Sequence, residues 1–131
     1  MTRVRVIVTG SRALTDRDLV WEALAVARWE LGPLIVVHGA APGADTLAAL
    51  WVEQHPGLDC AEEPHRADWA RLGRGAGPIR NQAMVDAGAV LCIGFPVSGS
   101  RGTRDCMRRA EAAGIPVREI RAAKVPGCTP R

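Results

Sequence analysis

Residues 34–45 are LIVVHGAAPGAD, and this stretch decides the fold. Its four consecutive apolar residues lack the alternation of a half-exposed strand, so they predict a strand covered on both faces. The glycines at 39 and 43 predict a turn, and a helical pattern follows from Ala44. A strand that leads through a glycine turn into a helix is typical of a parallel sheet between two layers of helices.

The rest of the chain repeats this alternation. The predicted strands lie at residues 4–9, 34–38, 58–63, 89–95 and 115–120. The predicted helices lie at about residues 16–31, 44–55, 78–87 and 103–113, with one helical turn around Trp69. Thr15 is expected to cap the first helix, and Pro78 fits the first position of its helix. We expect a three-layer α/β fold with a five-stranded, mainly parallel sheet in the order 3-2-1-4-5.

Composition limits the class of protein. The chain has 131 residues, of which 47% are hydrophobic and 24% charged, as in one soluble globular domain. Residues 1–121 are expected to form this domain and residues 122–131 a flexible tail. No apolar run approaches the ~20 residues that span a bilayer, and no secretory signal is visible, so a cytoplasmic protein is expected.

Net charge and residue types limit the classes of ligand and macromolecule that the chain is expected to bind. A net charge of +3 suits an anionic small ligand or weak contact with nucleic acid, but requires neither. Tyr is absent and Phe occurs once, so a base-stacking surface of the RNA-binding kind is poorly supplied. The four cysteines form no C-x-x-C pair and the three histidines have no ligand spacing. We predict no metal, no cofactor and no catalytic histidine.

Three loops that follow predicted strands carry residues suited to anion binding: residues 10–12, 39–45 and 98–103. The carboxyl ends of parallel strands meet at one edge of a sheet, so we expect these loops to line one pocket. The small residues at 98–103 let backbone N–H groups approach a phosphate, and the following helix adds its positive dipole end. The alternative is an ordinary turn capped by Thr103.

Single charged residues beside these loops have two interpretations each. Asp45 either caps its own helix, the commoner role, or binds a ribose hydroxyl. Arg12 either pairs with a phosphate through two hydrogen bonds or is a solvated surface residue. Arg80, early in its helix, either reaches the pocket at the strand ends or is an ordinary surface arginine.

The whole set resembles the YspA-like group of small Rossmannoid proteins in the SLOG superfamily, which is named for Smf/DprA and lonely-guy proteins. The resemblance runs from residue 4 to about residue 120 and rests on Gly10-Ser11-Arg12, Gly39-Ala40-Ala41-Pro42-Gly43-Ala44-Asp45, Ala67-Asp68-Trp69, Arg80-Asn81 with Met84, and Gly102-Thr103-Arg104-Asp105.

This resemblance implies a Rossmann-like domain that binds a nucleotide or nucleotide-derived ligand, ADP-ribose-like or a nucleoside monophosphate, as a sensor or processing domain. The residues expected to bind it are Gly10, Ser11, Arg12, Gly39, Gly43, Ala44, Asp45, Asp68, Trp69, Arg80, Asn81, Gly99, Ser100, Gly102, Thr103 and Arg104.

The enzymes of the superfamily suggest an alternative, an N-glycosidic hydrolase of the phosphoribohydrolase type. Their R-K-x-x-M element looks like residues 80–84 and their G-G-x-G-T-x-x-E element like residues 99–106, with Cys106 in place of the glutamate. If the protein is an enzyme, we expect Arg80 to hold the phosphate and Asp45 or Asp105 to supply the catalytic carboxylate.

Two further expectations concern macromolecular partners. A DprA-like nucleic-acid binder is the third hypothesis, but the basic residues are dispersed, so nucleic acid is not expected as a partner. A homodimer or larger assembly is predicted because Trp21 and Trp29, eight residues apart in one helix, point to roughly similar sides and would form an exposed apolar patch. The alternative is that both tryptophans pack on the sheet.

Overall fold

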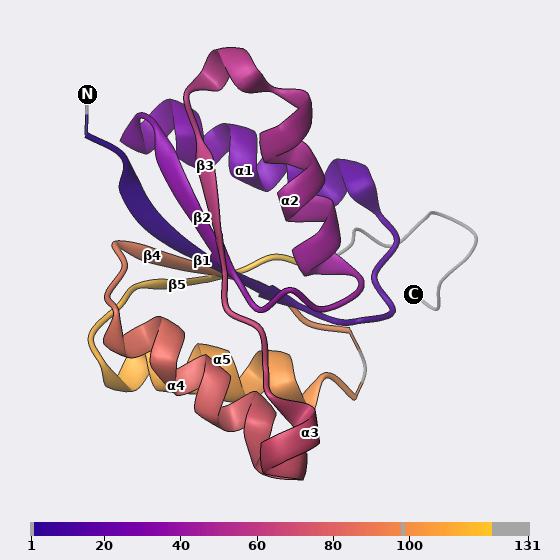
Figure 1. Cartoon of the computed structure of the whole chain (residues 1–131). Helices are drawn as coiled ribbons and strands as arrows, with labels where there is room; N and C mark the ends of the chain where they lie inside the picture. Colours follow the sequence, from indigo (N-terminus) through magenta and orange to yellow (C-terminus); the bar gives the residue numbers. More distant parts are fainter. Residues whose placement is uncertain (1, 98, 122–131) are drawn as a thin grey trace, which may run out of the picture.

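The computed structural model describes residues 2–97 and 99–121. Its centre is a five-stranded parallel sheet in the order β3-β2-β1-β4-β5, which confirms the predicted order (Figure 1). The strands are β1 Val4–Gly10, β2 Leu34–His38, β3 Ala61–Pro64, β4 Leu91–Phe95 and β5 Val117–Glu119. Ser98, Cys128 and the predicted tail at residues 122–131 lie outside the described residues.

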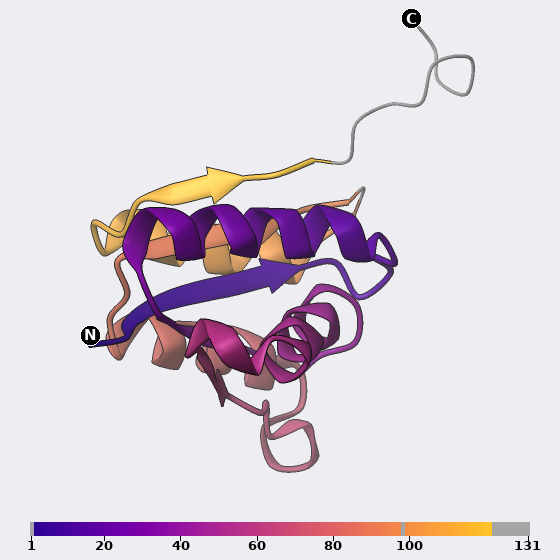
Figure 2. The same ribbon diagram turned by 90° about the horizontal axis from the view of Figure 1, so that it is seen from above.

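Helices cover both faces of this sheet, as a Rossmann-like fold requires (Figures 1 and 2). They are α1 Arg17–Leu31, α2 Ala44–Gln54, α3 Trp69–Leu72, α4 Ala76–Asp86 and α5 Arg101–Ala112, with short 3₁₀ helices η1 Pro56–Leu58 and η2 Gly73–Gly75. α1 and α2 pack together on one face, and α4 and α5 on the other. Within the described residues, no helix is long and apolar enough to cross a membrane.

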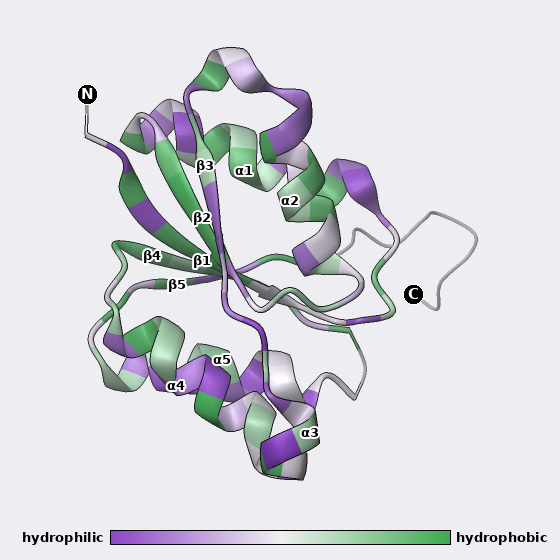
Figure 3. Ribbon diagram, viewed as in Figure 1, coloured by the Kyte–Doolittle hydropathy of each residue, from purple (hydrophilic) through white to green (hydrophobic). Residues whose placement is uncertain are grey.

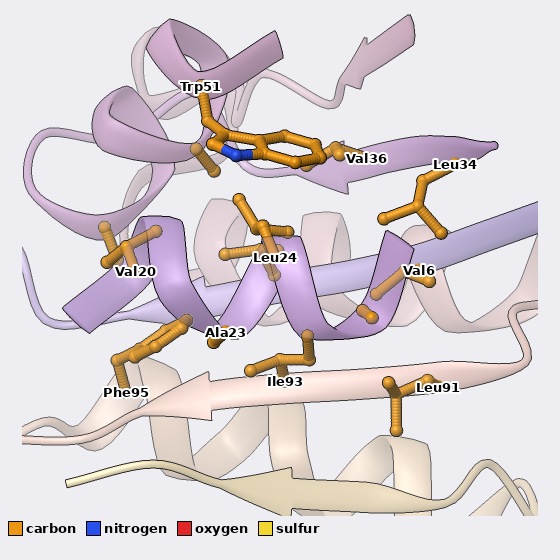
Figure 4. Packing of buried hydrophobic residues seen from close by; sticks show 14 of the residues in the cluster. Val6, Val20, Ala23, Leu24, Leu34, Val36, Trp51, Leu91, Ile93 and Phe95 are labelled. Atoms are coloured by element: carbon orange, nitrogen blue, oxygen red, sulfur yellow. The ribbon is translucent and has the colours of Figure 1, made fainter. Parts of the chain in front are cut away.

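The central strands are apolar on both faces because each face meets a helical layer. In β1, Val6 and Val8 pack on the side of α1 and α2, whereas Ile7 packs on the side of α4 and α5, and all three are fully buried. Leu24 and Trp51 fill the first layer against the sheet (Figure 4). Burial of each such side chain contributes about 1.5–3 kcal/mol. The same strands are mostly green in the hydropathy view (Figure 3).

Several predicted element ends were wrong. Asp16, not Thr15, caps α1, and its carboxylate accepts a hydrogen bond of 3.1 Å from the Leu19 N–H. α4 begins at Ala76, which places Pro78 at its third position, still within the first turn where proline is tolerated. α5 begins at Arg101, two residues before the predicted start, so Thr103 does not cap it.

The predicted tryptophan patch does not form. The indole N–H of Trp21 donates to the Leu47 carbonyl oxygen at 2.9 Å, and the ring packs edge-on against His55. Trp29 is 86% exposed. The two rings therefore have different surroundings, because α2 covers the part of α1 that carries Trp21.

Candidate functional site

A cleft of about 660 Å³ lies where β1, β2 and β4 end, between the loops that follow these strands and the helices α3, α4 and α5. This volume falls within the ~300–1,000 Å³ of small-molecule sites. The predicted site residues that line it are Gly10, Ser11, Arg12, Gly39, Asp45, Trp69, Arg80, Asn81, Gly99, Ser100, Gly102, Thr103 and Asp105. Four others, Gly43, Ala44, Asp68 and Arg104, are not among its lining residues.

Gly43 and Ala44 instead join the first two loops to each other. Gly43 has a φ of +82°, and a Cβ there would overlap the carbonyl oxygen of Ser11. The Ala44 N–H donates to the same oxygen at 3.4 Å, and a Cβ at Gly10 would overlap that of Ala44. Small residues at these points let the two loops touch, which shapes the wall of the cleft.

The Asp45 carboxylate is the most buried acid of the cleft, with the residue only 5% exposed. Oδ2 accepts hydrogen bonds from the N–H groups of Gly39 at 2.9 Å and Ala41 at 3.3 Å. Asp45 therefore holds its own loop and does not cap α2, whose N-cap is Gly43. Oδ1 is buried with no hydrogen-bond partner among the described residues.

This environment shifts the titration of Asp45. Burial raises the pKa of the carboxyl above its usual value, although the N–H groups of Ala41 and Gly39 and the positive charge of Arg80 oppose the shift. A buried carboxyl with one free oxygen can accept a hydrogen bond from a ligand or, when protonated, donate one.

Arg80 reaches the cleft from α4, as predicted for the pocket. Its Nη1 donates to the Gly39 carbonyl oxygen at 2.6 Å and its Nε to Asn81 Oδ1 at 2.8 Å. A Cβ at Gly39 would overlap the guanidinium, so glycine is needed for this close approach. Arg80 therefore joins the second loop to α4, and its Nη2 has no partner among the described residues.

Asn81 connects α4 to the start of α5. Its Nδ2 donates to the Gly102 carbonyl oxygen at 3.2 Å and to Asp105 Oδ2 at 3.0 Å, and the side chain is buried. Asp105 also accepts from Arg109 Nε at 2.9 Å. Although burial raises it, the hydrogen bonds from Arg109 and Asn81 hold the pKa of Asp105 below its usual value. Asp105 is thus an ionised, already paired carboxylate.

The start of α5 forms one end of the cleft. Gly99, Ser100, Gly102 and Thr103 line it there. Ser100 is the N-cap but makes no side-chain hydrogen bond to the helix, because its Oγ accepts from the Val97 N–H at 2.8 Å. The first N–H groups of a helix have no intrahelical partner, so this end offers donors to an anion.

Four arginines line the cleft, against two acids. Arg12 and Arg80 were predicted, whereas Arg101 and Arg108 were missing from the predicted binding residues. Arg101 and Arg108 lie on the same face of α5 as Asp105, because the three residues recur at intervals of four and three. This helical spacing is the sequence signal that could have identified the two arginines. The signal was not used because the helix was predicted to start at residue 103, which left Arg101 outside it.

Trp69 forms part of the cleft wall opposite Arg12. The guanidinium carbon of Arg12 lies 5.3 Å from the centre of a Trp69 ring, which is within range for a cation–π contact. Asp68 caps α3, since its carboxylate accepts from the Arg71 N–H at 3.1 Å. Asp68 therefore contributes to the cleft indirectly, by stabilising the helix that carries Trp69.

Cys106, at the position of the glutamate in the hydrolase element, is fully buried. It belongs to the same buried cluster as Cys92 and is not among the lining residues of the cleft. The side chain at this position points into the layer between β4 and α5, where it packs with Met84 and Ala110.

Comparison with known proteins gives three findings. The model of the YspA, cpYpsA-related SLOG family matches residues 4–72. The Gene 61 protein of Mycobacterium phage D29 is 50% identical over an alignment of 117 residues, and the match covers 86% of this chain and 93% of that protein. A structure of DNA processing protein A from Helicobacter pylori, described for its single-stranded DNA binding mode, is similar with a TM-score of 0.60 at 18% identity. That likeness covers 90% of this chain and 65% of the other and shows a shared fold.

Proposed function

Because the chain belongs to the YspA, cpYpsA-related SLOG family, we propose that it binds a nucleotide or nucleotide-derived small molecule as a sensor or processing domain. The observation that carries this proposal is the cleft itself. Three strand-end loops meet there around about 660 Å³, with four arginines and a buried carboxylate that has one oxygen free. Membership of the family supports nucleotide-related binding, and the charge of the lining supports an anionic ligand.

The phosphate of the ligand is proposed to lie at the start of α5. The N–H groups of Gly102 and Thr103 are free of a side-chain cap there, and Arg101 lies beside them. Arg12 has no ion pair among the described residues and supplies a second guanidinium from the facing loop. Helix-terminal N–H groups together with arginine are a common arrangement for phosphate binding.

The ribose is proposed to lie over Asp45. Its Oδ1 is buried and unpaired, and a buried oxygen without a partner costs roughly 1–3 kcal/mol. A ribose hydroxyl that donates to Oδ1, after a movement of residues 39–41 that opens this oxygen to the cleft, would recover part of this cost. Arg80 Nη2, on the neighbouring α4, is the donor best placed for the remaining oxygens of the ligand.

Gly102→Asp tests the phosphate position. A Cβ at Gly102 meets no atom within 4 Å, so the variant is expected to fold, while its carboxylate repels an anion at the start of α5. We expect affinity for AMP, ADP-ribose and ribose 5-phosphate, measured by calorimetry, to fall at least tenfold. Gly102→Ala is the matched control and should bind as the wild type does. Equal affinity of Gly102→Asp and wild type would place the phosphate elsewhere.

The hydrolase is a second candidate, and the unpaired Oδ1 of Asp45 is the observation that favours it. A carboxylate beside ribose C1′ would stabilise the cation that forms as the bond to the base breaks, before water adds at C1′. Asp105 is already paired with Arg109 and Asn81, and Cys106 does not line the cleft, so Asp45 is the one of these groups that can serve.

Turnover of nucleoside monophosphates separates catalysis from binding alone. Release of free base by the wild type that is lost in Asp45→Asn would establish the hydrolase. Binding without base release would establish the sensor. Activity that survives in Asp45→Asn would remove the assigned role of Asp45.

Single-stranded nucleic acid is a third ligand to test, because the structural neighbour from Helicobacter pylori is described as binding single-stranded DNA. The expectation that nucleic acid is not a partner therefore needs an experiment. Anisotropy of a labelled oligonucleotide at two salt concentrations is sufficient. Tight binding that mononucleotides do not compete would favour a nucleic-acid binder over the proposed function.

A further inference from the structure

Trp69 is a large apolar side chain that the fold leaves 47% exposed in the wall of a cleft that four arginines also line. We propose that this ring recognises the base of the ligand by stacking, with the base held between Trp69 and the guanidinium of Arg12. The inference rests on the proposed function. It concerns the base of the ligand, which the proposed phosphate and ribose contacts do not recognise.

The position of the ring is set by two short-range features. Asp68 caps the single turn of α3 that begins with Trp69. Gly77, in the first turn of α4, lies against the outer edge of the six-membered ring, because a Cβ there would come within 3.1 Å of Trp69 Cη2. The ring is therefore supported from the protein side while about half of its surface stays open.

Arg12 shows that this ring accepts a flat, positively charged partner. Its guanidinium carbon lies 5.3 Å from the ring centre, and within the described residues Arg12 makes no hydrogen bond or ion pair through its side chain. Its donors are therefore available, and the contact with Trp69 is the one that orients it. A nucleobase is also flat and polarisable, and both tryptophan and arginine stack on such rings.

The two residues come from opposite sides of the cleft. Arg12 belongs to the loop after β1, and Trp69 to α3 just before α4. A base that enters between them displaces the Arg12 guanidinium outward from the ring, replaces one stacking contact by two, and leaves the ribose and phosphate to the rest of the cleft. Stacking of this kind tolerates different bases, so the expected ligand class is nucleotides in general.

The experiment compares ligands with and without a base. Dissociation constants of the four nucleoside 5′-monophosphates and of ribose 5-phosphate are measured for the wild type, Trp69→Leu, Trp69→Phe and Trp29→Leu. In the wild type, the monophosphates should bind about tenfold more tightly than ribose 5-phosphate. Trp69→Leu should remove this difference without changing the affinity for ribose 5-phosphate. Trp69→Phe should retain most of it.

Trp29→Leu is the matched control, because Trp29 is 86% exposed on α1 and does not line the cleft. It should bind every ligand as the wild type does. Equal affinity of the wild type for monophosphates and ribose 5-phosphate would overturn the stacking inference while leaving the phosphate site intact. An equal loss of both ligands in Trp69→Leu would also overturn it, since it would indicate a structural role. Failure of every ligand to bind the wild type would overturn the proposed function as well.

Discussion

At the scale of single residues, the cleft is built on groups whose surroundings differ from those of ordinary surface residues. Asp45 is a buried acid whose pKa is raised by burial, whereas Asp105, on α5, is an acid whose pKa is lowered by its hydrogen-bond partners despite partial burial. The contrast separates a carboxyl that is free to meet a ligand from one that fixes the start of α5.

The raised pKa of Asp45 predicts a pH dependence of stability. A carboxyl with a higher pKa in the folded than in the unfolded protein binds more protons when folded, so its contribution to stability falls as pH rises above ~3.9, the unfolded value. We expect Asp45→Asn to gain stability relative to the wild type as pH is raised from 3 to 7. Urea unfolding of both proteins across this range is the measurement. A difference that is constant with pH would contradict a raised pKa.

Gly39 is predicted to be intolerant of any side chain. In Gly39→Ala, the added Cβ would overlap the Arg80 guanidinium and break its hydrogen bond to the Gly39 carbonyl oxygen. We expect the free energy of unfolding to fall by about 1–3 kcal/mol. Gly57→Ala is the control, because a Cβ at Gly57 meets nothing within 4 Å. Denaturant unfolding of both variants should show a loss in the first and little change in the second.

At the scale of elements, the order of strands and helices follows from pattern, but their ends follow from local hydrogen bonds. Both Thr15 and Asp16 are residue types that cap helices, and the stronger N-cap preference of aspartate already favours Asp16 over the predicted Thr15. The structure assigns the cap to Asp16.

The cap assignment predicts a loss of stability for one of two neighbouring substitutions and almost no change for the other. Asp16→Ala removes the hydrogen bond to the Leu19 N–H and a favourable charge near the start of α1, so it should destabilise the fold by about 1 kcal/mol. Thr15→Ala should change stability by less than ~0.5 kcal/mol. Thermal unfolding of both variants distinguishes them, and a larger loss in Thr15→Ala would return the cap to Thr15.

At the scale of the whole molecule, the prediction of a homodimer now rests on Trp29, because Trp21 is engaged by Leu47 and His55. An exposed tryptophan on α1 is a favourable centre for a protein interface. We expect light scattering to give the mass of a dimer for the wild type and of a monomer for Trp29→Ser. A monomeric wild type at high micromolar concentration would contradict the prediction.

The sequence by itself determined the order of elements, the parallel sheet and the three strand-end loops that meet at the cleft. Doubly apolar strands such as residues 34–38 and 91–95 require a helical layer on each face, and right-handed crossovers then leave few topologies. The convergence of the loops after β1, β2 and β4 follows from that topology. These features are encoded in residue types at short range, so they are visible without the tertiary structure.

The tertiary structure decided what each residue does inside the cleft. Gly43, predicted to bind ligand, packs against the loop after β1, and Asp68, also predicted to bind ligand, caps α3. Arg108, which was not predicted, lines the cleft from the second turn of α5. The unpaired oxygen of Asp45 likewise depends on which N–H groups the neighbouring loop presents to it. Such roles depend on contacts between segments that are far apart in the chain. Packing sets the geometry of these contacts, so no local sequence pattern predicts them.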